Sequence, residues 1–194
     1  MQTLNCRGTL IDLSIPKVMG IINVTPDSFY DGGKTFSEKE ILKQAERMLS
    51  EGATFLDVGG YSTRPGAEDI SETEEIRRVV ESVESMLKRF PEALISVDTF
   101  RSEVAKKAVE TGAAIVNDVS GGTLDGEMYK TAAKLNVPYI LMHMRGTPKT
   151  MAKLTDYKNV TVEVLKNLSE KIAMARAEGI NDIIADPGFG FAKT

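Results

Sequence analysis

Cysteine, histidine and tryptophan are almost missing from this sequence, which has one cysteine, one histidine and no tryptophan among 194 residues. The single cysteine, Cys6, excludes an intramolecular disulfide framework and a cysteine-rich zinc site. The His, Asp and Glu residues show no zinc-ligand spacing either. The simplest prediction from the thiol content is a protein of the reducing cytoplasm.

Long apolar runs and an excess of positive charge are also absent. No run approaches the roughly 18 residues that span a bilayer, and residues 1–14 are too polar for a signal peptide. The formal net charge is -4, which provides no basic field to attract nucleic acid. We therefore expect a globular protein with neither a membrane nor nucleic acid as a partner.

The sequence does contain a regular alternation of strand and helix patterns. Short apolar runs that indicate strands occupy residues 18–24, 55–58, 94–97, 115–119, 139–142 and 183–185. Helical patterns separate them, over residues 41–49, 76–90, 101–110, 127–135 and 160–178. Capping boxes at residues 37–40 and 71–74 indicate two helix starts. The first fifteen residues fit no such unit, and they predict a small hairpin around Arg7 and Gly8 that acts as a cap.

This alternation predicts a parallel sheet, for which two architectures compete. A doubly wound sheet would carry a GxGxxG loop, which this sequence lacks. A (β/α)8 barrel instead places polar groups at the carboxyl ends of several strands, and six predicted strands end at Asn23, Asp57, Asp98, Asn117, His143 and Asp186. We predict an α/β fold, a single (β/α)8 TIM-barrel domain over residues 1–194 with an N-terminal hairpin cap. Because only six of eight strands are found, we expect this domain to lack its last two βα units.

The polar strand ends predict a ligand site. Asp98, Asn117 and Asp186 should converge over the mouth of the barrel, where buried carboxylates and amides need partners. A flat heterocycle with amino and carbonyl edges would supply them. Any one of the three could instead cap the following helix, but six polar strand ends on one face exceed what capping explains.

Two loops on the same predicted face add to this site. In "GGYSTRPGAEDIS", Ser62, Thr63 and Arg64 could hold an anionic group, although an ordinary exposed loop is the alternative. In "DPGFGFAKT", Phe189 and Phe191 could stack on a planar ligand, or could pack against helices.

The single histidine and any metal are less defined by the sequence. His143 could act as a base, but no nucleophile pattern surrounds it, which favours a structural role. A metal here should be a hard cation such as Mg2+, held partly by phosphate oxygens.

The motifs together resemble the dihydropteroate synthase family of pterin-binding enzymes. The matching stretches are "MGIINVTPDSFYDGG", "DVGGYSTRPGA", "SVDT", "NDVSGG", "LMHMRGTP" and "DPGFGFAKT", in the family's order and spacing. The resemblance implies a transferase of folate biosynthesis and sulfonamide target, which joins p-aminobenzoate to 6-hydroxymethyl-7,8-dihydropterin diphosphate and releases pyrophosphate. It also implies Mg2+ as cofactor and a homodimer in the full-length form.

The resemblance assigns roles residue by residue. It places the pterin against Asp98, Asn117 and Asp186, with Met142 and Phe189 nearby, and it places Asn23 at the magnesium and diphosphate. Thr63 contacts the pterin substrate, while the aminobenzoate side is shaped by Phe29, Ser62, Thr63, Arg64 and Pro65. The polar residues after the first barrel strand resemble a mobile loop over the diphosphate, and residues 25–34 and 62–68 are expected to be the least ordered loops without ligand.

The sequence departs from the family pattern at two places. Tyr61 stands where many relatives have an acidic residue. The family's cationic groups of strands 7 and 8 have no counterpart within the 194 residues, so we expect this chain alone to be inactive. Two other functions remain open, namely a pterin-binding methyltransferase-type domain and an inactive pterin-binding fragment.

Overall fold

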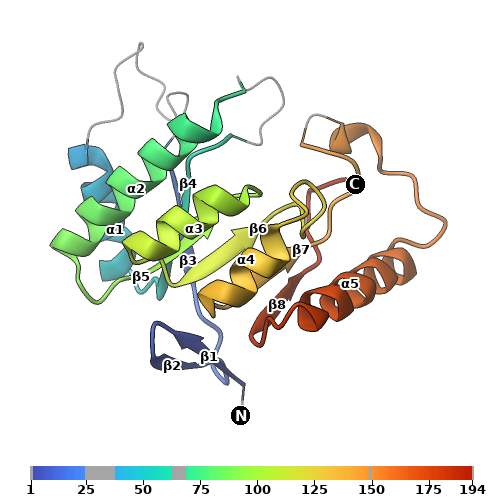
Figure 1. Cartoon of the computed structure of the whole chain (residues 1–194), viewed down its shortest axis with the longest axis horizontal. Coiled ribbons are helices and arrows are strands. Elements are labelled where there is room, and N and C mark those ends of the chain that lie inside the picture. Colours follow the sequence, from blue (N-terminus) through green and yellow to red (C-terminus); the bar gives the residue numbers. More distant parts are fainter. Residues whose placement is uncertain (1, 25–37, 63–68, 149, 194) are drawn as a thin grey trace.

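The computed structural model describes residues 2–24, 38–62, 69–148 and 150–193 (Figure 1). The strands are β1 (Thr3–Cys6), β2 (Thr9–Asp12), β3 (Met19–Asn23), β4 (Phe55–Gly59), β5 (Leu94–Asp98), β6 (Ile115–Asp118), β7 (Tyr139–Met142) and β8 (Ile183–Asp186). The helices are α1 (Glu38–Ser50), α2 (Glu72–Arg89), α3 (Ser102–Thr111), α4 (Met128–Leu135), a short 3-10 helix η2 (Met151–Lys153) and α5 (Val160–Ala177).

Strands β3 to β8 form one parallel sheet in which neighbours in the chain are neighbours in space, in the order β3-β4-β5-β6-β7-β8. A helix lies between each pair of successive strands, which is the repeating unit of a (β/α) barrel. All six strand predictions are confirmed, and so is the predicted α/β barrel fold. Among the described residues, no strand pairs with the outer edge of β3 or β8.

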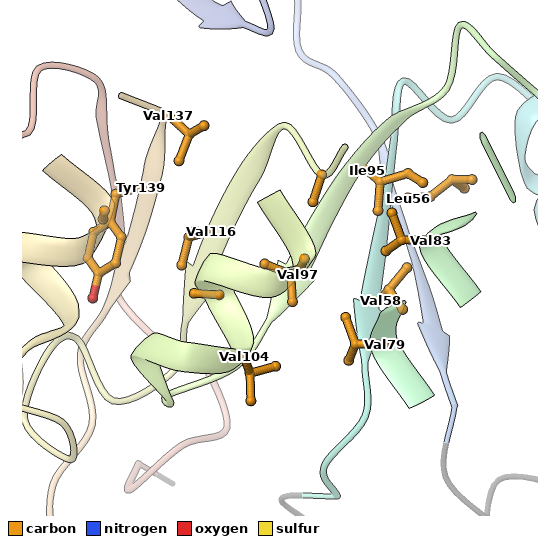
Figure 2. Close-up of a cluster of buried hydrophobic side chains, with 14 of the residues drawn as sticks. Leu56, Val58, Val79, Val83, Ile95, Val97, Val104, Val116, Val137 and Tyr139 are labelled. Atoms are coloured by element: carbon orange, nitrogen blue, oxygen red, sulfur yellow. The ribbon is translucent and has the colours of Figure 1, made fainter. Parts of the chain in front are cut away.

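The sheet has an outer face, which we define as the face covered by the helices. Alternate side chains of each strand point to this face and pack on apolar helix residues, as Figure 2 illustrates. The strands contribute Ile22, Leu56, Val58, Ile95, Val97, Val116, Tyr139 and Leu141, and the helices contribute residues such as Val79, Val83 and Val104. This alternation leaves the remaining strand residues for the opposite face, which we call the inner face.

The inner face is apolar toward the amino ends of the strands, where the β1–β2 hairpin covers it. Leu4 and Cys6 of β1 are buried against Phe55, Ile115 and Ile140 of the sheet. The hairpin turns through Arg7 and Gly8, both at positive φ (53° and 85°). The predicted hairpin cap is thus confirmed, and it confines any site on the inner face to the carboxyl ends of the strands.

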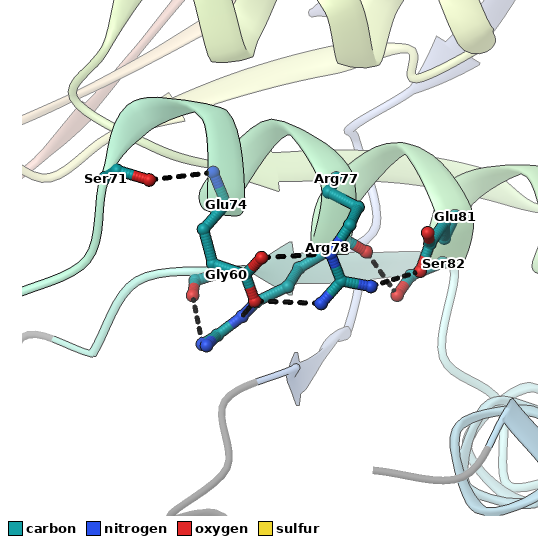
Figure 3. A network of polar contacts seen from close by, with 7 residues as sticks. All are labelled: Gly60, Ser71, Glu74, Arg77, Arg78, Glu81 and Ser82. Carbon is teal, nitrogen blue, oxygen red and sulfur yellow. Dashed lines mark hydrogen bonds and ion pairs between the residues drawn. The ribbon is translucent and has the colours of Figure 1, made fainter. Parts of the chain in front are cut away.

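The predicted helix starts are confirmed where the structure describes them. The Ser71 side chain accepts a hydrogen bond from the Glu74 backbone N–H at 3.2 Å (Figure 3). This N-cap starts α2 at Glu72, four residues before the predicted start at residue 76, because the apolar pattern becomes visible only after the acidic first turn. Ser37, the first residue of the other capping box, lies outside the described residues.

Candidate functional site

Three predicted residues lie on the inner face at the carboxyl ends of neighbouring strands. The strand register aligns Asn23 with Gly59, Gly59 with Asp98, and Asp98 with Asn117. A Cβ atom placed on Gly59 would lie 3.4 Å from Asp98 Oδ2 and 3.7 Å from Asn23 Oδ1. The missing side chain at Gly59 therefore leaves space between an amide and a carboxylate, which a ligand could use.

Asp57 is a buried member of the same face. Its Oδ2 accepts a hydrogen bond from Asn117 Nδ2 at 2.9 Å, which reaches from β6 across β5 to β4. Its Oδ1 is buried without a hydrogen-bond partner among the described residues. An orphaned carboxylate oxygen has a large desolvation cost, so it favours a ligand or water that brings a donor.

Asp57 was not among the predicted site residues, although the sequence carried a signal. It interrupts an apolar strand, and it matches Asn117 when the segments "GATFLDV" and "GAAIVND" are aligned. The two matched positions prove to be hydrogen-bonded to each other.

The carboxylates of this face are electrostatically coupled. Burial raises the pKa of Asp57, while the neighbouring Ser96 hydroxyl and then the Asn117 amide oppose the rise. Burial, reinforced by the charge of Asp57, raises the pKa of Asp98 well above its ordinary value. A pair of this kind can present both a protonated carboxyl, which donates, and a carboxylate, which accepts. That combination suits a heterocycle edge with donors and acceptors side by side.

Asp186 lies on the inner face two strands beyond Asn117. It ends β8 in register with Met142 of β7, and its Oδ1 accepts a hydrogen bond from Gly188 N at 2.7 Å. A Cβ on Gly188 would lie 3.0 Å from Met142 Cγ, so this loop packs closely on Met142. The structure therefore pairs Asp186 with Met142 and places both at the same end of the sheet as the Asn23–Asp98–Asn117 group.

The glycine-rich loop after β8 is held by a lysine. Lys193 Nζ donates to the carbonyls of Gly188 at 2.9 Å and Phe191 at 2.8 Å. Phe189 remains 84% exposed, whereas Phe191 packs in an apolar cluster with Met142. Phe191 is thus packed, as the alternative expected, but mainly on strand and loop residues rather than on helices. Phe189 presents an exposed ring for which ligand stacking stays a prediction.

Several predicted site residues lie outside the described residues. They are Phe29, Thr63, Arg64 and Pro65. Ser62 is described and half-buried. The predicted disorder of residues 25–34 and 63–68 likewise concerns positions outside the described residues.

His143 is a buried histidine whose Nδ1 has no hydrogen-bond partner among the described residues. Burial, followed by the charges of Lys193 and Lys171, lowers its pKa from 6.5 to about 4. The neutral imidazole is therefore the form that fits the fold, in agreement with the predicted structural role.

The lowered pKa of His143 predicts an acid-sensitive contribution to stability. Because the pKa of the folded state lies below the unfolded value, the contribution is complete above about pH 6.5 and is lost as the pH falls toward about 4. We expect His143→Gln to reduce the loss of stability over this interval, measured as urea midpoints at pH 7, 5.5 and 4.5. Parallel pH curves for variant and wild type would show that His143 has no such role.

Two general searches of the structure give negative results. Across the described ranges, no helix is both long and apolar enough to cross a bilayer. Within the same ranges, no group of three or more His, Cys, Asp or Glu side chains is arranged to hold a metal ion.

Comparison with known proteins identifies relatives of this chain. The profile of a family described as pterin binding enzyme matches residues 19–194. Dihydropteroate synthase of Escherichia coli K12 is 47% identical over 189 residues, which are 96% of this chain and 66% of that protein. The folic acid synthesis protein fol1 of Schizosaccharomyces pombe is 50% identical over 179 residues, or 91% of this chain and 24% of that protein. The chain thus spans between about a quarter and two thirds of these relatives.

Solved structures agree with the sequence relatives. Yersinia pestis dihydropteroate synthase, in a complex with a sulfonamide drug, superposes with a TM-score of 0.91 at 44% identity, covering 100% of this chain and 70% of that one. Dihydropteroate synthase of Xanthomonas albilineans, in complex with 7,8-dihydropteroate, gives a TM-score of 0.84 at 38% identity, covering 99% and 68%.

Proposed function

Because this chain belongs to the pterin binding enzyme family, we propose that it provides the pterin-binding part of a dihydropteroate synthase. The reaction joins p-aminobenzoate to 6-hydroxymethyl-7,8-dihydropterin diphosphate, giving 7,8-dihydropteroate and pyrophosphate. The observation that carries the proposal is the polar layer of Asp57, Asp98 and Asn117 on the inner face of the sheet.

The pterin ring is the proposed ligand of this layer. Its ring N–H and exocyclic amine would donate to the carboxylates, including the orphaned Asp57 Oδ1. Asn117 can accept and donate through one amide, and its bond to Asp57 fixes the direction of that amide. Asp186, with Met142 and Phe189, would close the other side of the ring.

Asn23 fits a magnesium ion that is shared with the substrate. Its amide oxygen lies at the mouth of the inner face beside Gly59 and Asp98, and Mg2+ prefers oxygen ligands while keeping phosphates and waters in its shell. The diphosphate oxygens would contribute further ligands to the ion. When bound, the ion would supply charge neutralisation for the diphosphate.

The side chains act mainly by positioning and electrostatics. As the carbon–oxygen bond at the pterin methylene breaks, Asp98 and Asp186 would stabilise the positive charge that develops across the pterin, and this charge would in turn favour the ionised form of Asp98. The amine of p-aminobenzoate then attacks the methylene carbon. On the family pattern, the aminobenzoate side is formed by Phe29, Ser62, Thr63, Arg64 and Pro65.

The proposal extends to the setting of the reaction. The protein is expected to work in the cytoplasm as a homodimer in its full-length form, with small molecules rather than nucleic acid or membranes as partners. The net charge of -4 supports the exclusion of nucleic acid.

Pyrophosphate release tests the function directly. Because the 194 residues alone are expected to be inactive, the assay uses the protein as expressed from its own gene. We expect release only when p-aminobenzoate, the pterin diphosphate and Mg2+ are all present, and we expect EDTA to abolish it. A pterin-binding methyltransferase-type domain or an inactive fragment would bind the pterin without releasing pyrophosphate. Pterin binding without p-aminobenzoate-dependent release would therefore contradict the proposal.

A further inference from the structure

Arg101 connects two loops at the carboxyl end of the sheet. It stands three residues after the end of β5, and its Nη1 donates to Glu75 Oε2 of α2 at 2.7 Å. Its Nη2 donates to the carbonyl of Ile70 at 3.0 Å, just before α2 begins. One guanidinium therefore binds both the first turn of α2 and the residues that lead into it.

The same guanidinium also covers the start of the β4–α2 connection, of which the structure describes residues 60–62 and 69–71. Its central carbon lies 5.4 Å from the centroid of the Tyr61 ring and 5.4 Å from that of Phe100. The two rings meet edge to face at 5.1 Å. Tyr61, the residue at which this sequence departs from the family pattern, is thus packed in a cation–π and aromatic cluster.

Glu75 anchors this arrangement because it is fully buried and fully paired. Its second carboxylate oxygen accepts from the Thr99 hydroxyl at 2.6 Å. Burial raises its pKa, while Thr99 and Arg101 oppose the rise. A Cβ on Gly60 would lie 3.1 Å from Glu75 Cγ, so the backbone after β4 runs directly against this side chain.

These contacts hold the β4–α2 connection at both of its ends. Arg101 touches Tyr61 near the beginning and Ile70 near the end. Arg78 adds only a long contact of 3.5 Å to the Gly60 carbonyl, seen in Figure 3. Ser62, a predicted aminobenzoate residue, directly follows Tyr61 in this connection.

We infer that Arg101 is a positioning residue for the described ends of the β4–α2 connection and, through Ser62, for p-aminobenzoate; this rests on the proposed function. Arginine suits the role because its planar fork donates in two directions while its face stacks on rings. A lysine ammonium has neither the fork nor the plane. Binding of the pterin should depend less on Arg101, since its contacts do not include the proposed ring-binding residues Asp57, Asp98, Asn117 and Asp186.

Steady-state kinetics with Arg101→Lys and Arg101→Met test the inference in the protein expressed from its own gene. Because small displacements of positioning groups carry large penalties, we expect KM for p-aminobenzoate to rise about tenfold or more. KM for the pterin diphosphate should rise clearly less, because the proposed ring-binding side chains are not contacts of Arg101. Should Arg101→Met not fold, Arg101→Lys and Tyr61→Leu give the same comparison.

Arg145→Met is the matched control. Like Arg101, Arg145 donates to a carboxylate (Nη2 to Glu163 Oε2, 3.0 Å) and to a backbone carbonyl (Nη1 to Asp156 O, 2.5 Å). Its Cζ also lies 4.0 Å from the centroid of the Tyr157 ring. These contacts lie in the connection between β7 and α5 and in the first turn of α5, so the variant should leave KM for p-aminobenzoate unchanged. Thermal unfolding of each variant reports any general loss of stability.

The outcomes separate this inference from the proposed function. If the wild type releases no pyrophosphate, the proposed function fails, and hydrogen–deuterium exchange of residues 60–62 and 69–71 then decides whether Arg101 holds the connection. Faster exchange in Arg101→Met than in Arg145→Met supports the positioning role. Unchanged exchange in these residues overturns it. If the enzyme is active, the inference is also overturned by an unchanged KM for p-aminobenzoate or by an equal rise in KM for both substrates.

Discussion

Asp186→Asn is expected to weaken pterin binding about ten- to hundredfold, since a hydrogen bond to a charged group contributes roughly 1.5–3 kcal/mol. Asp186 ends β8 on the inner face, and its Oδ1 is held by Gly188 N at 2.7 Å. The amide keeps the size and shape of the carboxylate while removing the charge that a pterin N–H donor would meet. Calorimetric titration with 6-hydroxymethylpterin measures the difference.

Asp182→Asn is the control for this experiment. Asp182 stands just before the same strand at its opposite end, where Oδ2 accepts from the backbone N–H of Asn5 at 2.8 Å. Asp182→Asn makes the same change of charge at the amino ends of the strands, which the hairpin covers. Equal affinities for wild type and Asp186→Asn, or equal losses in both variants, would remove Asp186 from the pterin site.

Gly188→Ala is expected to reduce stability through both backbone strain and a steric clash. At φ 67°, a side chain costs about 1–2 kcal/mol. In addition, its Cβ would lie 2.5 Å from the carbonyl oxygen of His143 and 3.0 Å from Met142 Cγ. Backbone must move to relieve the first contact, so a further penalty of about 1–3 kcal/mol is expected.

Gly190→Ala separates the clash from the backbone strain. Gly190 has a similar φ of 82°, but no atom lies within 4 Å of its hypothetical Cβ. Gly190→Ala should therefore lower the free energy of unfolding only by the cost of the backbone strain, about 1–2 kcal/mol. Urea denaturation of the two variants gives the comparison, and equal losses would show that the loop after β8 moves freely away from His143.

Local sequence patterns predicted the elements of this fold well because each pattern reports a local physical rule. The apolar run at residues 94–97 proved to be β5, since buried parallel strands have two covered faces. Ser71 predicted a helix start because its hydroxyl satisfies a free backbone N–H of the first turn. Even the hairpin was predictable, because Gly8 readily adopts the left-handed backbone (φ 85°) that its turn requires.

The candidate site was only partly predictable from the same information. The sequence indicated that Asp98, Asn117 and Asp186 end their strands, and parallel strands place such ends at one edge. It did not reveal the bond between Asn117 and Asp57, because that bond crosses an intervening strand and depends on how the sheet is staggered. The free ring of Phe189 and the packed ring of Phe191 were likewise indistinguishable, since both follow glycines in one loop.

The sequence by itself determined the family, the strand–helix alternation and the end of the sheet at which the polar groups gather. These properties follow from residue types at fixed spacing along one chain. Only the tertiary structure decided which polar groups are partnered, such as Glu75 with Arg101, and which are left without a partner, such as Asp57 Oδ1 among the described residues. The physical reason is that burial and hydrogen bonding join atoms from segments far apart in sequence, and these long-range contacts set both the pKa of a carboxylate and its need for a ligand.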